Sequence, residues 1–209
     1  PLGGYDMQIE RAGALMASHD IKFWAGLNED LGATAVWGSQ QLGQFAGARY
    51  DGVFGIWYGK APGVDRTGDV FKHANFAGTA KFGGAIAVAG DDHMCKSSTL
   101  PSQSEFAFMD AEIPVLSPAS IQDVLDYGLY GFAMSRFSGA WAGLIALADT
   151  MDSGAVIDVG AHRLDIRLPL DFDMPAEGLS LRRGDDPMAK EARLRQYKLP
   201  AAQAFVRAN

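Results

Sequence analysis

Glu29 has the sequence surroundings that best suit chemistry in this chain. It follows Asn28 and an apolar run, IKFWAGL at residues 21–27, which we expect to form a short buried strand. A carboxylate at the tip of such a strand could serve in an active site. The same acid also suits a structural role, because Asn28 is a good helix N-cap and acidic groups stabilise the positive end of a helix. The local sequence leaves the cap and the catalytic role open.

The segment after Glu29 is unusual for a helix. Residues 30–43 have a helical pattern, but they include Gly32 and Gly38, each of which costs roughly 1 kcal/mol relative to alanine in a helix interior. With Ala33, Ala35 and Ser39, these glycines leave a face of low relief. We therefore expect the sheet, another subunit or a bound ring to approach this helix closely.

Two further polar clusters could contribute to a site. Residues 59–69 form a Gly- and Pro-containing loop, and residues 90–104 form a second polar loop. The candidate ligand-binding residues in these loops are Lys60, Gly63, Asp91, Asp92, His93, Ser97 and Ser98.

Several motifs with a known mechanism are absent or weak. The sequence contains neither a P-loop nor a GxGxxG dinucleotide fingerprint. The stretch DDHMC at residues 91–95 offers metal ligands, with His73 as a distant fourth, yet a polar loop explains it better, and we expect no metal site here. Cys95 as a thiol nucleophile lacks any local signature and is favoured still less.

The elements that must position these groups alternate along the chain. Continuous apolar runs predict strands at 53–59, 84–92 and 113–118, and helical patterns predict helices at 70–80, 103–111 and 121–135. Residues 141–150 fit a strand or a helix. Strands alternating with helices predict an α/β fold, with a parallel sheet covered on both faces. Ligands bind such sheets outside the carboxyl ends of the strands, where all three polar clusters fall.

Composition narrows the class of protein. The 209 residues are 48% hydrophobic, carry a formal charge of −7 and contain one cysteine. The charge argues against nucleic acid or an anionic membrane as a partner, and no apolar run reaches the roughly 20 residues of a membrane span. A single cysteine forms no internal disulfide, so we expect a cytoplasmic setting, and it cannot hold an iron–sulfur cluster.

Residues 1–160 are predicted to form the domain, and residues 161–209 a connecting segment. HRLDIRLP at 162–169 alternates like an edge strand, residues 171–187 resemble a linker, and 188–209 have a helical pattern with Pro200 as a break. Both ends of the chain suggest a piece cut from a longer polypeptide.

Four ordered blocks carry a family resemblance. They are GLNEDLGATAVWGSQQ, YGKAPGVDRTGDVFKHANFAGTA, GDDHMCKSSTLPSQSEFAF and IPVLSPASIQDVLDYGL. Together they resemble the pyrimidine-binding region of indolepyruvate ferredoxin oxidoreductases, which are thiamine diphosphate enzymes that oxidise 2-oxo acids. The likeness covers residues 1–150 and continues more weakly through 188–209, and it implies the thiamine diphosphate-binding, pyrimidine-domain fold.

The resemblance implies roles for the candidate residues. Glu29 would bond the ring nitrogen of the cofactor's aminopyrimidine and share a proton with it, as a buried carboxyl of raised pKa can. Asn28 and the candidates in the two loops would line the cofactor and substrate pocket. The family decarboxylates (aryl) 2-oxo acids to acyl-coenzyme A and passes electrons through iron–sulfur clusters to ferredoxin.

The resemblance also implies what other parts of an enzyme must supply. GDG, which with a later Asn holds magnesium and diphosphate in thiamine enzymes, does not occur in this sequence. We therefore expect an absent diphosphate domain, of the same or another subunit, to complete the site, commonly across a homodimer. Magnesium and the clusters would belong to the parent enzyme, and this fragment alone would be inactive. Two alternatives stay open: a non-catalytic dimerisation or packing module, and a non-redox 2-oxo acid decarboxylase domain.

Overall fold

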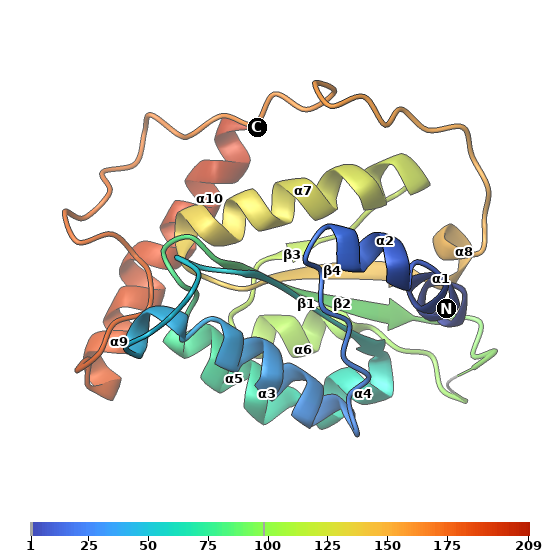
Figure 1. Cartoon of the computed structure of the whole chain (residues 1–209), viewed down its shortest axis with the longest axis horizontal. Coiled ribbons are helices and arrows are strands. Elements are labelled where there is room, and N and C mark those ends of the chain that lie inside the picture. Colours follow the sequence, from blue (N-terminus) through green and yellow to red (C-terminus); the bar gives the residue numbers. More distant parts are fainter. Residues whose placement is uncertain (1, 98) are drawn as a thin grey trace.

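A parallel sheet forms the centre of the molecule. The computed structural model describes residues 2–97 and 99–209, and this part of the chain contains one four-stranded sheet in the order β1-β2-β4-β3. The strands are β1 (Phe54–Lys60), β2 (Gly84–Asp91), β3 (Val115–Leu116) and β4 (Ala142–Leu147). Every neighbouring pair is parallel, so the predicted α/β class with a parallel sheet is confirmed (Figure 1).

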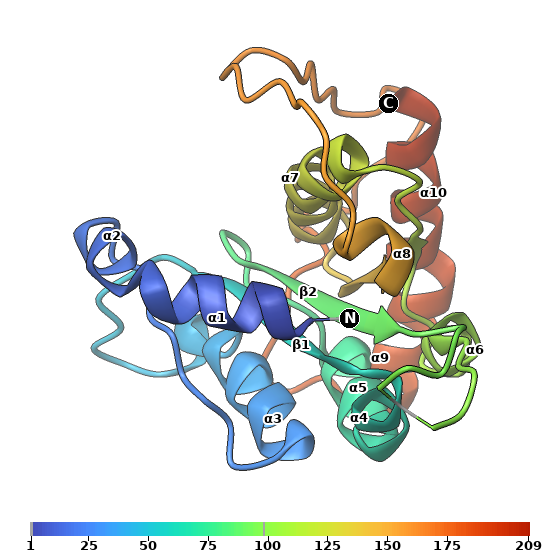
Figure 2. The ribbon, with the colours of Figure 1, turned by 90° about the vertical axis from the view of Figure 1, so that its right-hand side faces the viewer.

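Helices cover both faces of this sheet, as predicted (Figures 1 and 2). One face carries α3 (Glu29–Ser39), α4 (Ala61–Arg66), α5 (Gly68–Ala77) and α6 (Ser104–Asp110). The other face carries α7 (Ile121–Ser138) and α10 (Leu199–Ala208). The buried apolar residues accordingly form two clusters, one on each side of the strands.

Small residues let the helices approach the strands. All of β2 is buried, and its sequence GAIAVAGD contains only Ile86 and Val88 as large apolar side chains. A Cβ atom on Gly143 of β4 would lie 2.8 Å from Cδ2 of Phe108 on α6, so this position needs glycine. The small residues of β2 and Gly143 of β4 therefore leave room for side chains from the helices, such as Phe108.

Helix ends follow the signals in the sequence. The Ser120 hydroxyl accepts a hydrogen bond from Asp123 N at 3.1 Å and caps the start of α7, as its position predicts. The same helix ends at Gly139, whose φ of 72° is the left-handed conformation that glycine adopts most easily.

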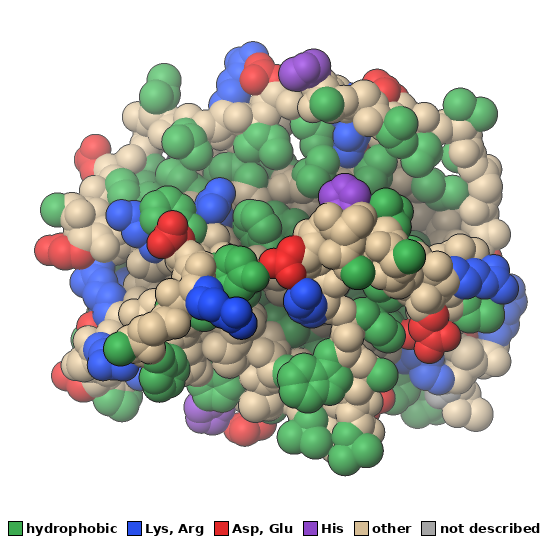
Figure 3. All heavy atoms as spheres, viewed as in Figure 1, with side chains coloured by type: hydrophobic (Ala, Val, Ile, Leu, Met, Phe, Trp, Pro, Cys, Tyr) green, Lys and Arg blue, Asp and Glu red, His purple; other side chains and the backbone are tan. Residues whose placement is uncertain are grey.

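The strand predicted at residues 21–27 is wrong. This segment joins no strand ladder, and β1 lies at the edge of the sheet with β2 as its only neighbour in the described part of the chain. Trp24 is 80% exposed and Leu27 is 89% exposed. Hydrophobic side chains accordingly lie on the lower part of the face in Figure 3, where this segment runs. An apolar run can resemble a buried strand whether or not the same chain covers it.

Several remaining elements are short. Near the N-terminus lie α1 (Gly3–Arg11) and α2 (Gly13–Ser18), and a 3₁₀ turn, Leu42–Gln44, follows α3. Residues 141–150, for which the sequence allowed a strand or a helix, form β4 and then α8 (Ala148–Met151).

The C-terminal part of the chain packs against the domain. Residues 152–186 contain no helix or strand, so the edge strand predicted at 162–169 is wrong, and they cross above α7 in Figure 1. The chain then forms α9 (Pro187–Arg193), a π-helical turn (Leu194–Lys198) and α10 without an intervening non-helical residue. The helical backbone is therefore not broken at Pro200, which comes just after the π-helical turn, a common distortion beside proline in a helix. Phe205 of α10 belongs to the core cluster beside α7.

The domain boundary placed at residue 160 stays a prediction.

None of the helices in residues 2–97 and 99–209 has both the length and the apolar composition that crossing a membrane requires.

Candidate functional site

Glu29 is the first residue of α3, and its main chain is held in place. Asn28 Oδ1 accepts a hydrogen bond from Leu31 N at 2.9 Å, so Asn28 is the N-cap of this helix. The Trp57 indole of β1 donates to the main-chain oxygen of Glu29 at 3.0 Å. The start of α3 is therefore anchored to the edge strand of the sheet.

The Glu29 side chain lies against Gly63 of α4, so the loop predicted at residues 59–69 is wrong: Pro62 occupies the first turn of a short helix, where proline is tolerated. A Cβ atom on Gly63 would be 2.6 Å from Glu29 Cγ and 3.2 Å from Oε1, so any larger residue would displace the carboxyl group. Gly63 itself is buried. The structure thus brings together two of the predicted polar clusters, and it shows a reason for glycine at position 63.

The Glu29 carboxylate is open to solvent on its other side. Its side chain is 42% exposed, and Arg66 Nε lies 3.9 Å from Oε2. Arg66 makes a closer contact of 3.1 Å with Oδ1 of the adjacent Asp30. The expected location at the tip of a buried strand is wrong, because the preceding segment is exposed and Glu29 begins a helix. Glu29 is therefore both an acid in the first turn of a helix and a carboxylate that solvent can reach.

The third cluster reaches the same edge of the sheet. Lys60 at the end of β1 is in register with Gly90 of β2, so the residues that follow these two strands start side by side. Lys60 Nζ donates to the main-chain oxygen of Ser97 at 2.7 Å. This contact joins α4, of which Lys60 is the N-cap, to the loop at residues 92–103.

Two buried carboxylates organise that loop. Asp91 accepts from Ser104 N at 2.8 Å and from Ser104 Oγ at 2.5 Å. Burial raises the pKa of Asp91, while both hydrogen bonds from Ser104 act in the opposite direction. Asp92 accepts from Ser97 N at 2.7 Å and from Ser97 Oγ at 3.2 Å, and the main-chain hydrogen bond from Ser97 lowers the pKa of Asp92. Asp91 and Asp92 therefore shape the loop.

The other predicted loop residues contribute less. His93 is exposed, and Ser98 lies outside the described residues. Cys95 Sγ contacts the main-chain oxygen of His93 at 3.8 Å and not its ring. His73 lies on α5 beside Trp37, with ring centroids 6.2 Å apart. Within the described residues, no three His, Cys, Asp or Glu side chains form a group that could hold a metal ion.

Sequence reasoning missed two residues of the loop and its end. Three side-chain oxygens in this region are buried and have no hydrogen-bond partner among the described residues. They are Ser102 Oγ, Glu105 Oε2 and Asp92 Oδ1. Each of these oxygen atoms can accept a hydrogen bond from a ligand or from water. Serine and glutamate are common in loops and first helical turns, so no sequence signal distinguished them.

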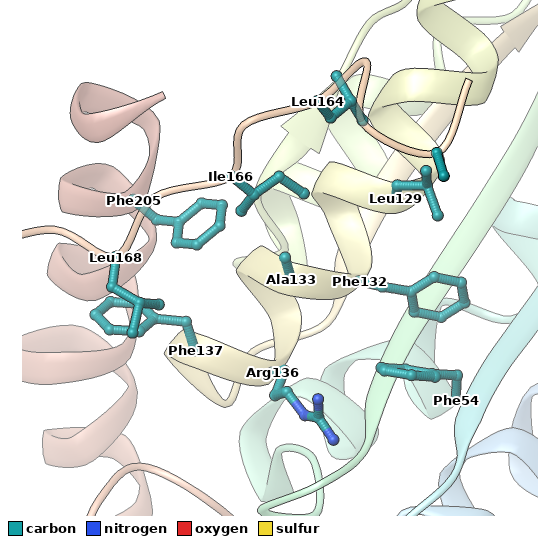
Figure 4. A pocket seen from close by; sticks show the side chains of 11 residues that line it. Phe54, Leu129, Phe132, Ala133, Arg136, Phe137, Leu164, Ile166, Leu168 and Phe205 are labelled. Atoms are coloured by element: carbon teal, nitrogen blue, oxygen red, sulfur yellow. The ribbon is translucent and has the colours of Figure 1, made fainter. Parts of the chain in front are cut away.

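An apolar cavity lies away from the sheet edge that carries Glu29. It has a volume of about 710 Å³ and lies between α7 and residues 161–168. Figure 4 shows apolar side chains around it, with Arg136 beside the Phe54 ring at one end. None of the predicted site residues lines this cavity, so it is separate from the carboxylates at the sheet edge.

No protein-family model matches the chain, and no curated protein matches it either.

Proposed function

We propose that this chain is the pyrimidine-binding domain of an indolepyruvate-type 2-oxo acid:ferredoxin oxidoreductase, with the pyrimidine-domain fold of thiamine diphosphate enzymes. The observation that carries the proposal is the contact between Glu29 and Gly63 at the carboxyl end of a parallel sheet. Candidate residues from three of the four resembling blocks are in contact there, Glu29 with Gly63 and Lys60 with Ser97.

The residues at this edge fit one half of the cofactor. An aminopyrimidine offers ring nitrogens and an amino group, and it needs an accessible carboxyl group together with acceptor atoms. The Glu29 carboxylate is accessible, and in the chain after β2 the buried oxygens Asp92 Oδ1 and Glu105 Oε2 have no hydrogen-bond partner within the described residues. The diphosphate and its magnesium do not fit, because the described residues contain no group of three metal ligands. This half of the cofactor belongs to the proposed diphosphate domain.

Thiamine diphosphate, when bound, supplies the electron sink for loss of carbon dioxide from a 2-oxo acid. The role of Glu29 is to hold or release a proton at its carboxyl group toward the pyrimidine ring nitrogen. Asn28 and Trp57 fix the helix start from which this carboxyl group extends. Gly63 leaves the space that the Glu29 side chain occupies. Lys60 holds the loop after β2 through Ser97.

A covering partner would change the environment of Glu29. The apolar segment at residues 21–27 is exposed together with Leu31 of α3, so a large hydrophobic surface borders the carboxylate. Burying this surface against the diphosphate domain, in the same or a second subunit of a homodimer, would also remove the Glu29 carboxylate from solvent. The proposed complete enzyme supplies the coenzyme A, ferredoxin and iron–sulfur sites.

A second candidate function is a packing or dimerisation module without a catalytic role. The 42% exposure of the Glu29 side chain at a helix start favours this candidate. A non-redox decarboxylase domain is a variant of the first proposal, and cluster-binding cysteines elsewhere in the parent polypeptide would exclude it.

Calorimetric titration with thiamine diphosphate and magnesium tests the division of the cofactor between domains. The 209-residue chain is expected to bind it weakly or not at all, whereas the parent enzyme binds it tightly. Tight binding by this chain alone would contradict the assignment of the diphosphate to another domain, and no binding by the parent enzyme would exclude the thiamine-dependent function.

A further inference from the structure

A second, smaller cavity lies at the other end of α3 from Glu29. Its volume is about 290 Å³, and it lies between the C-terminal ends of α3 and α5, residues 181–183 and α9. In Figure 1 this is the end of the sheet near α9, whereas the strands point toward the opposite end. The helix α3, which has 11 residues and is roughly 16 Å long, separates this cavity from Glu29. The cavity is therefore distinct from the candidate site described above.

Three cationic side chains line this cavity. They are Arg182, Arg183 and Lys190, and no carboxylate of the described residues lines it. Arg182 is anchored, because its Nη2 donates to Gly178 O at 2.6 Å. No Asp or Glu oxygen in the described part of the chain lies within 4.0 Å of the Arg183 or Lys190 nitrogens. At least two of the three positive charges thus lack a counterion.

The helix ends near the cavity do not neutralise these charges. The C-terminus of a helix carries about half a negative elementary charge, so α3 and α5 together contribute about one. Arg182 Nη2 lies 3.9 Å from Glu177 Oε2, and the two remaining cations, Arg183 and Lys190, still exceed that amount. One carbonyl at the end of α5, Ala77 O, already accepts a hydrogen bond from Lys198 Nζ at 3.2 Å. The local potential in the cavity is therefore positive.

The hydrogen-bonding groups of the cavity wall, like its positive charges, favour an anionic ligand. Trp37 Nε1 and Arg182 Nε are buried donors without an acceptor among the described residues, and both side chains line the cavity. Gln41 and Gln44 add amide groups, and Phe45 adds an apolar ring, over which the Arg183 guanidinium lies at 5.7 Å. The wall combines unused donors, cations and a flat apolar surface.

We propose that this cavity binds a small phosphomonoester attached to a planar ring. A phosphate dianion matches an excess of cations better than a carboxylate does, and arginine binds phosphate with two hydrogen bonds. Trp37 and Phe45 provide the surface on which a ring can pack. The volume lies at the lower end of the range for ligand pockets, so one ring with its phosphate fills it.

Phenyl phosphate is the probe, titrated into the 209-residue chain by calorimetry and by NMR of the four tryptophan indole N–H signals. We expect a Kd of about 0.1–1 mM. The Trp37 indole signal, assigned with Trp37→Phe, shifts on binding. Arg183→Gln and Lys190→Gln each weaken binding about tenfold. Arg11→Gln, which removes an exposed arginine of α1, leaves the affinity unchanged.

Inorganic phosphate and benzoate separate the contributions of the charge and the ring. Both are expected to bind more weakly than phenyl phosphate. Benzoate binding as tightly as phenyl phosphate would overturn the assignment of a dianion, and equally tight inorganic phosphate would overturn the role of the ring. If no binding is detected at 10 mM phenyl phosphate, which corresponds to roughly 2.7 kcal/mol of affinity, the proposed site is refuted. An affinity that falls as much in Arg11→Gln as in Arg183→Gln or Lys190→Gln would refute it as well. Thermal unfolding of each variant confirms that it is folded before titration.

Discussion

Replacing Lys198 by methionine is expected to stabilise the protein at pH 7 and below. Lys198 is 1% exposed, and its Nζ donates to Ala77 O at 3.2 Å. Burial, followed by the nearby Arg193 charge, lowers the pKa of Lys198 from 10.5 to about 7. Because the folded-state pKa is the lower one, the unfolded chain binds more protons between these two values.

The size of the effect follows from this pKa difference. A depression from 10.5 to about 7 corresponds to roughly 4–5 kcal/mol of stability, lost as the pH falls through this range and absent at pH 7 and below. The wild-type free energy of unfolding should therefore rise by up to about 1.4 kcal/mol per pH unit between these pKa values. Methionine removes this dependence but leaves Ala77 O without its donor, which costs roughly 1–3 kcal/mol. The net gain at pH 7 is about 1–4 kcal/mol.

Urea unfolding followed by circular dichroism, at several pH values from neutral upward, measures both quantities. Lys198→Met should be more stable than the wild type at pH 7, and its advantage should shrink and reverse as the pH approaches 10.5. Lys72→Met is the matched control, because it removes a lysine whose side chain is 52% exposed and pairs with Asp110. It should keep the wild-type slope. A Lys198→Met protein that is less stable at pH 7, or that keeps the wild-type slope, would refute the reasoning.

Three substitutions test the geometry at the sheet edge. Gly63→Ala places a methyl group 2.6 Å from Glu29 Cγ and should expel that carboxyl group, so that parent-enzyme turnover falls by at least about tenfold. The free energy of unfolding should change by less than about 1 kcal/mol, because the helix preference of alanine offsets the displaced rotamer. Gly68→Ala, with open space around it at the start of α5, should leave turnover unchanged and raise the free energy of unfolding by at most about 1 kcal/mol. Asp91→Ala should lower the free energy of unfolding by roughly 2–4 kcal/mol, and Ser104→Ala by about 1 kcal/mol, because Asp91 accepts two hydrogen bonds from Ser104. A larger loss for Ser104→Ala, or unchanged turnover for Gly63→Ala, would contradict these assignments.

Local signals predicted most of the sheet and its helices. Ser120 and Asn28 cap helices as their residue types indicate, and the run at 84–92 is a fully buried strand. The segment at 21–27 was mispredicted because a continuous apolar run carries no information about what covers it. In the described chain nothing pairs with it, and its side chains face solvent.

The site could be predicted only in outline. The rule for parallel sheets located the three polar clusters at one edge, and Lys60 with Ser97 confirms that two of them meet. The contact between Glu29 and Gly63 depends on how α3 and α4 pack, which residue spacing does not determine. The cavity beside Lys190 was missed for a similar reason, since residues 171–187 have the composition of a linker and their position against α3 is a tertiary feature.

Ferredoxin reduction driven by a 2-oxo acid, measured in the proposed parent enzyme with Glu29→Gln, tests the proposed catalytic role of Glu29 most directly. Asp30→Asn is the matched control, because it removes an acid from the same helical turn that pairs with Arg66 at 3.1 Å. We expect Glu29→Gln to lower turnover by at least about a hundredfold, as for loss of an acid–base group, with Asp30→Asn close to the wild type. Near-wild-type turnover in Glu29→Gln, or an equal loss in both variants, would show that Glu29 only caps its helix.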